Sequence, residues 1–112
     1  MPVGAVPEVN PQQFYAWLQD HRGVQVVDAR TKTEYLLGTI GNARHAPLTE
    51  MPGSMEGLSL DASHPVVVLC LSGHRSRPGT RWLRARGYEA YSLQGGVMAW
   101  KAAGFSTEKP KE

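Results

Sequence analysis

The chain has a single cysteine, Cys70, among its 112 residues. One cysteine excludes an internal disulfide and a thiolate cluster, and the four histidines lack the spacing of a zinc site. Nothing in the cysteine usage demands an oxidising compartment. We therefore expect no catalytic metal.

A strong excess of charge is also missing. Twelve Lys and Arg residues oppose ten Asp and Glu residues, which gives a net charge of +2, whereas dedicated nucleic-acid binders are strongly basic. No apolar run approaches the length of a membrane span, and the proline-broken N-terminus has no signal-peptide pattern. We expect a cytoplasmic protein that binds neither nucleic acid nor membrane, unless a leader has been removed.

Short apolar stretches alternate with helical patterns along the whole chain, and the length suits a single domain over residues 1–112. The expected strands are Val24–Asp28, Ala43–Ala46, Val66–Leu69 and Glu89–Leu93. Helical patterns follow Asn10, Thr31, Ser76 and Gly96. The first two begin with the residues of a capping box, Asn10 with Gln13 and Thr31 with Glu34. The alternation predicts an α/β fold with a central, mostly parallel sheet of about five short strands and helices on both faces. We expect residues 1–9 to be an extended N-terminal segment, 49–64 a loop with one helical turn, and 106–112 a flexible tail.

The stretch Val66–Ser76 carries the most distinctive chemistry. An apolar strand ends at Cys70, a loop with Gly73 and Arg75 follows, and a helical pattern begins directly afterwards. Ligands of open α/β sheets bind at the carboxyl ends of strands, and helix N-termini and cations favour the thiolate form of cysteine. A cysteine after an apolar run is also common in protein cores. The polar loop that follows favours a nucleophile over a core residue.

The loop from Cys70 to Arg75 is short enough to direct several backbone N–H groups at the sulfur. Gly73 permits the positive φ that such a turn requires, and His74 and Arg75 add positive potential at its rim. Four residues separate Cys70 from Arg75, one fewer than in the phosphate-binding loop of cysteine phosphatases. We expect this shorter loop to fit a sulfur atom better than a phosphate group.

Three blocks of the sequence resemble the single-domain rhodaneses, a family of sulfurtransferases. They are Asp28-Ala29-Arg30 with Glu34–Ile40, the loop Cys70–Ser76, and the stretch Leu93–Gly104, which is the most specific of the three. The resemblance extends over nearly the whole chain. It implies the rhodanese-like fold.

The resemblance also implies a mechanism without a cofactor. As a thiolate, Cys70 would take a sulfane sulfur from thiosulfate or another small anionic donor such as a persulfide. The resulting persulfide would pass its outer sulfur to cyanide or a thiol acceptor. The expected site residues are Leu71, Ser72, Gly73, His74 and Arg75 around the persulfide, Arg30 along the pocket, and Asp28 and Ser76 in support of the site.

Two other functions remain open. The chain could be a sulfur-relay or interaction module whose Cys70 receives sulfur from a protein partner and has little activity on free thiosulfate. It could also be a cysteine phosphatase or arsenate reductase on the same fold, which the short loop disfavours.

The chain departs from the family pattern at several positions. Thr39, Asn42 and His45 stand where the family often has His, Gly and Asn. We expect these changes to affect stability or a partner surface rather than catalysis. Pro78 and Gly79 replace small, helix-forming residues and are expected to alter the first turn of the helix after Cys70.

Overall fold

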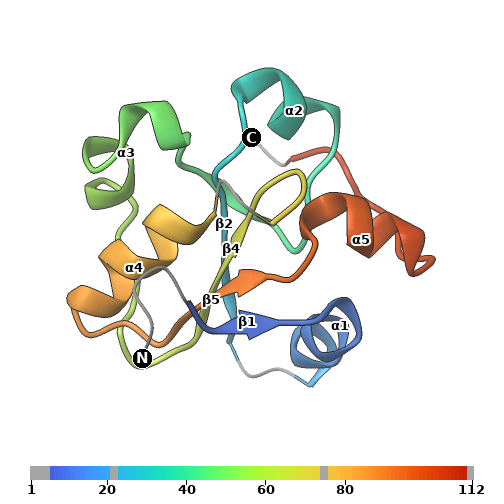
Figure 1. The fold of residues 1–112 in the computed structure, drawn as a ribbon, viewed down its shortest axis with the longest axis horizontal. Helices are drawn as coiled ribbons and strands as arrows, with labels where there is room; N and C mark the ends of the chain where they lie inside the picture. The colour runs from blue at the N-terminus through green and yellow to red at the C-terminus, as the bar shows by residue number, and fades with distance from the viewer. Residues whose placement is uncertain (1–5, 21–22, 74–75, 111–112) are drawn as a thin grey trace.

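The computed structural model describes residues 6–20, 23–73 and 76–110, and the strands of this part form one parallel sheet (Figure 1). The strands are β1 (Glu8–Val9), β2 (Gln25–Asp28), β3 (Arg44–His45), β4 (Val66–Leu69) and β5 (Ala90–Leu93). They lie in the order β1-β5-β4-β2-β3, and each neighbouring pair is parallel. The α/β fold predicted from the sequence is confirmed.

Helices cover both faces of the sheet and its carboxyl edge. They are α1 (Pro11–Gln19), α2 (Lys32–Leu37), α3 (Gly53–Glu56), α4 (Arg77–Ala85) and α5 (Gly96–Ala102), with a 3₁₀ turn, η1, at Leu48–Glu50. In Figure 1, α1 and α5 lie on one side of the sheet, α3 and α4 lie on the other, and α2 lies beyond the carboxyl ends of β2 and β4. No helix in the described ranges is both long and apolar enough to cross a membrane.

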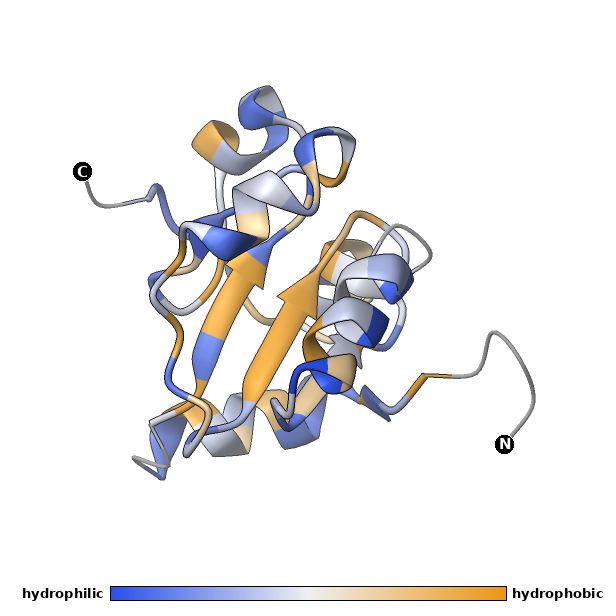
Figure 2. Cartoon of the chain, turned by 90° about the vertical axis from the view of Figure 1, so that its left-hand side faces the viewer, coloured by the Kyte–Doolittle hydropathy of each residue, from blue (hydrophilic) through white to orange (hydrophobic). Residues whose placement is uncertain are grey.

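The central strand β4 is buried on both faces. Val67 and Leu69 belong to a core cluster that includes residues of α1 and α5, whereas Val66 and Val68 belong to a second cluster that includes residues of α3 and α4. Strands covered on both sides read as continuous apolar runs rather than as alternating ones. Figure 2 shows this pattern, with strongly apolar strands between helices that carry hydrophilic residues.

Two predicted capping boxes start α1 and α2. Asn10 accepts a hydrogen bond from the backbone N–H of Gln13 at 2.8 Å, and the Gln13 side chain accepts from the N–H of Asn10 at 3.1 Å. Thr31 and Glu34 make the same reciprocal pair before α2. These bonds satisfy N–H groups that a helix start leaves unpaired. Both predictions are confirmed.

Element boundaries differ from the sequence expectation where local signals are weak. β1 was not expected as a strand, since Glu8–Val9 is only two residues long and gains its pairing from β5. β3 is shorter than the strand expected over residues 43–46. The segment expected as a loop with one helical turn, 49–64, contains α3 and part of η1. The sequence predicts that the first helix runs to residue 21 or 22, which lie outside the described residues, whereas α1 ends at Gln19 with Asp20 as its C-cap.

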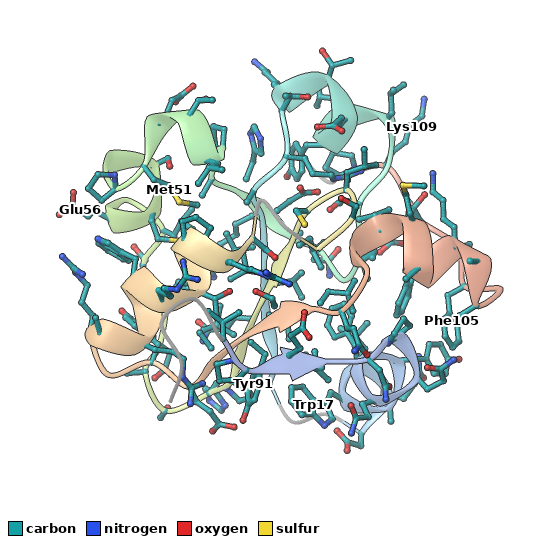
Figure 3. All side chains as sticks on the ribbon, in the orientation of Figure 1. Trp17, Met51, Glu56, Tyr91, Phe105 and Lys109 are labelled. Carbon is teal, nitrogen blue, oxygen red and sulfur yellow. The ribbon has the colours of Figure 1, made fainter. Side chains whose placement is uncertain are left out.

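Residues 106–110, the described part of the segment expected as a flexible tail over 106–112, are bonded to the rest of the domain. Glu108 pairs with Thr39 through two backbone hydrogen bonds of 2.7 and 2.9 Å. Just before it, Phe105 stacks on Tyr15 of α1 with ring centroids 4.6 Å apart (Figure 3). The sequence gives no sign of this attachment, because the partners of the segment lie far away along the chain.

Phe14 of α1 belongs to the core cluster on the side of the sheet that α1 and α5 cover. Its side chain is fully buried, and its ring centroid lies 5.4 Å from that of Trp100. We expect Phe14→Ala to lower the free energy of unfolding by about 3–5 kcal/mol, measured by urea denaturation, because the cavity cannot close completely. Gln12→Ala, on the exposed side of the same helix, should change it by less than about 0.5 kcal/mol. Equal losses would contradict the assigned core.

Candidate functional site

Cys70 directly follows β4, in the middle of the carboxyl edge of the sheet. The neighbouring strand β2 is hydrogen-bonded to β4 up to this point. The backbone N–H of Ala29, directly after β2, donates to the carbonyl oxygen of Leu69 at 2.9 Å. Cys70 itself has no exposed surface, whereas the next two residues, Leu71 and Ser72, are exposed. The thiol therefore lies beneath its own loop.

The loop turns back on the sulfur at Gly73. The backbone N–H of Gly73 donates to Cys70 Sγ at an N···S distance of 2.7 Å. Gly73 has a φ of +100°, which side chains disfavour, so the turn depends on glycine. This is the local geometry that the sequence predicts for Gly73. The rim residues His74 and Arg75 lie outside the described residues.

The first half of the loop is held by the start of α5. The backbone N–H of Val97 donates to the carbonyl oxygen of Cys70 at 2.8 Å, and that of Met98 donates to the carbonyl oxygen of Leu71 at 3.0 Å. The first N–H groups of a helix have no partner within the helix. Here they bind the loop, so α5 fixes the two peptides that directly follow the Cα atom of Cys70.

Two glycines make this close approach feasible. A Cβ atom on Gly96 would lie 2.5 Å from the carbonyl oxygens of both Cys70 and Leu71, and one on Gly73 would lie 3.1 Å from the nitrogen of Gly95. Gly95 and Gly96 also have positive φ values of 72° and 65°. Gly96 is therefore required both by its own backbone conformation and by its contact with the loop.

A buried ion pair supports the neighbouring loop after β2. Arg30 Nη2 lies 2.7 Å from Asp28 Oδ2, Arg30 Nε also donates to Asp28, and Nη2 donates to the carbonyl oxygen of Gly38. The carboxylate of Asp28 accepts a further hydrogen bond from Thr39 Oγ1 at 2.8 Å. All of these residues are buried. Asp28 and Arg30 thus bind the loop after β2 to the residues that follow α2.

The comparison with known protein families is decisive for classification. The rhodanese-like domain family matches residues 10–103. The chain belongs to this family. The resemblance drawn from the sequence motifs is thereby confirmed.

Named relatives agree with this assignment. Thiosulfate sulfurtransferase GlpE of Pseudomonas paraeruginosa is 35% identical over 81 residues, which cover 71% of this chain and 72% of that protein. The protein of the same name from Ectopseudomonas mendocina is 34% identical over 95 residues and 84% of each chain. A rhodanese-related protein from Thermoplasma volcanium has the same fold, with a TM-score of 0.79 at 23% identity over 90% of this chain and 96% of that one.

Of three departures from the family pattern, Thr39 and His45 have hydrogen-bond partners and Asn42 suits the conformation of its own backbone. Thr39 donates to Asp28, as described above. Asn42 has a φ of +57°, a conformation that asparagine tolerates better than most residues. His45 Nε2 hydrogen-bonds the carbonyl oxygen of Arg30 at 2.7 Å, and its ring stacks on Tyr35. A carbonyl only accepts, so Nε2 carries the proton. Thr39 and His45 thus both bind residues at the carboxyl edge of β2.

The fourth departure concerns the start of α4. Pro78 lies in the first turn, where its missing N–H has no helical partner to lose. A Cβ on Gly79 would lie 3.0 Å from Met51 Cε and 3.1 Å from Met55 Cε. Figure 3 shows Met51 between α3 and α4. The glycine lets the two helices approach, so this departure serves packing on the α3 side of the sheet.

Within the ranges 6–20, 23–73 and 76–110, no three His, Cys, Asp or Glu side chains are grouped as a metal site would require. A polar cavity of about 530 Å³ lies at the same edge of the sheet as Cys70, between the starts of α2 and α3. It is lined by Thr31, Lys32, His45, Pro47, Thr49, Glu50 and Ser54.

Sequence reasoning did not assign Gly96 or the start of α5 to the site. The stretch Gln94-Gly95-Gly96 predicts only a turn between a strand and a helix. Two consecutive glycines are nevertheless a signal of close backbone approach, and the structure places the Cys70 loop against them. The two glycines predict that another part of the backbone lies close, but they do not show which segment it is.

Gly96→Ala tests this contact. We expect the variant to lose stability and to expose Cys70 to alkylation, because a methyl group cannot occupy a point 2.5 Å from two carbonyl oxygens. Gly104→Ala is the matched control, since Gly104 also has a positive φ, +93°, but nothing within 4 Å of its Cβ position. The control should show only the conformational cost of about 1–2 kcal/mol. Equal effects on Cys70 accessibility would contradict the role of Gly96.

Proposed function

We propose that the protein is a thiosulfate-type sulfurtransferase that carries sulfane sulfur as a persulfide on Cys70. The observation that carries the proposal is the hydrogen bond from the Gly73 N–H to Cys70 Sγ within a loop anchored by α5. Such a donor stabilises negative charge on sulfur, and a hydrogen bond to a charged group contributes about 1.5–3 kcal/mol. The names of the GlpE relatives support the same chemistry.

In the first half-reaction the Cys70 thiolate attacks the outer sulfur of thiosulfate. A new S–S bond forms, the sulfur–sulfur bond of thiosulfate breaks, and its electron pair leaves with sulfite. In the second half-reaction cyanide or a thiolate attacks the outer sulfur of the persulfide. The S–S bond breaks, the product is thiocyanate or a new persulfide, and Cys70 is again a thiolate.

Each neighbouring residue has a proposed task in this cycle. Gly73, with the rest of the loop backbone over residues 71–75, surrounds the transferred sulfur, and Arg75 attracts anionic donors. Asp28 and Ser76 support the site. For Arg30, the buried ion pair with Asp28 favours positioning of the loop over direct contact with substrate.

A second candidate is sulfur relay to or from a protein partner. It is favoured by the apolar surface beside the buried thiol, where Leu71 is 39% exposed and Met98 is 58% exposed. The two residues are joined by the hydrogen bond from the Met98 N–H to the Leu71 carbonyl. Exposed apolar side chains next to a reactive group are typical of a surface that binds another protein. The two candidates differ in turnover of free thiosulfate.

Persulfide formation is the direct test. After incubation with thiosulfate, intact mass spectrometry should show a gain of one sulfur atom, and cyanide should remove it with release of thiocyanate. Cys70→Ser should show neither. Absence of the adduct in the parent protein, or turnover by Cys70→Ser, would refute the proposal. Loading only by a persulfidated protein, with none from thiosulfate, would favour the relay candidate.

Arg75→Ala tests recognition of the donor's charge. We expect it to lower kcat/KM for thiosulfate about tenfold to hundredfold, and to affect an uncharged persulfide donor much less, because only the anion loses a charged partner. Arg86→Ala removes the same charge at the far end of α4 and should leave both values near those of the parent. Equal losses with the two donors would refute the role of Arg75.

A further inference from the structure

A chain of buried hydroxyl groups connects the sheet to the end of the Cys70 loop. Thr80 of α4 and Ser92 of β5 are both fully buried, and their hydroxyl oxygens lie 2.7 Å apart. Thr80 Oγ1 donates its single proton to the carbonyl oxygen of Ser76 at 3.0 Å. Ser92 must therefore donate to Thr80. Buried hydroxyls are unfavourable unless bonded, so the pair is stable only as a connected unit.

Ser76 transmits this support to the loop. Serine is a common helix N-cap, but the Ser76 side chain makes no capping bond to α4. Its hydroxyl instead points back into the loop and donates to the carbonyl oxygen of Gly73 at 3.4 Å. Its own carbonyl accepts from both the N–H and the hydroxyl of Thr80, each at 3.0 Å. The carbonyl oxygen at the end of the loop thus accepts two hydrogen bonds from α4.

We propose that Thr80 and Ser92 are positioning residues for sulfur chemistry at Cys70, acting through Ser76 on the backbone of Gly73. The start of the loop is held by α5 through Val97 and Met98. The Thr80 hydroxyl holds its other end, and Ser92 orients that hydroxyl. The Gly73 N–H, which lies between the two anchors, is thereby kept directed at Cys70 Sγ. The inference rests on the proposed role of Cys70 as the nucleophile.

Two variants separate positioning from stability. Thr80→Val keeps the side-chain shape but leaves the buried Ser92 hydroxyl without its acceptor, so Tm should fall. The double variant Thr80→Val with Ser92→Ala removes both hydroxyls, so Tm should rise again towards that of the parent. Neither variant supplies the hydroxyl donor to Ser76. Both should therefore react more slowly with iodoacetamide at neutral pH, by about threefold to tenfold, the effect of one lost hydrogen bond.

The pH profile of alkylation and a rescue variant complete the test. The midpoint of the pH profile should move to higher pH in both Thr80→Val and the double variant, because the thiolate forms less readily when its N–H donor is displaced. Thr80→Ser restores the hydroxyl and should restore the parent profile. Thr33→Val, the same substitution at an exposed position of α2, should leave it unchanged.

Two results would overturn the inference. One is an unchanged profile in Thr80→Val, and the other is a double variant in which reactivity recovers together with Tm. Alkylation needs no thiosulfate, so this test is independent of the proposed activity. A parent protein that forms no persulfide but shows the expected shifts would refute the function and keep the positioning role.

Discussion

The site depends on the contact between the loop after Cys70 and the start of α5. The two backbones approach so closely that a single methyl group on Gly96 would overlap two carbonyl oxygens. Close approach brings the first N–H groups of α5 within bonding distance of the loop, which satisfies donors that a helix otherwise leaves to water. The same contact thus ends a strand, begins a helix and fixes the backbone that carries the thiol.

Two buried polar networks at the carboxyl edge of the sheet extend this arrangement. On the β2 side, Asp28 binds Arg30 and Thr39, and Thr39 in turn pairs with Glu108 of the C-terminal segment. On the β5 side, the hydroxyl chain from Ser92 reaches the end of the Cys70 loop. Each network joins segments far apart in sequence. The loops that line the edge are therefore held to distant segments by hydrogen bonds.

The predictable parts of this molecule are those with local causes. The apolar run before Cys70, the capping box at Asn10 and the need for positive φ at Gly73 are each encoded within a few residues, and the structure has each of them. The pairing of Glu108 and the partner of Ser92 are not local, because they follow from strand order and helix placement. From the sequence alone, Ser92 in a strand and Thr80 in a helix indicate only polar residues that these elements tolerate.

Backbone donors would suit the role proposed for Cys70, which is to attack a sulfane sulfur and then to carry it. A thiolate and a persulfide both place negative charge near the same point, and fixed N–H groups stabilise either one without moving a side chain. Such a site requires a loop whose position does not change between the two half-reactions. The Cys70 loop meets this requirement because both of its ends are held by hydrogen bonds, one end by α5 and the other by Ser76. Under the proposed function, Arg75 would select the donor by its charge, while the loop backbone would serve both half-reactions.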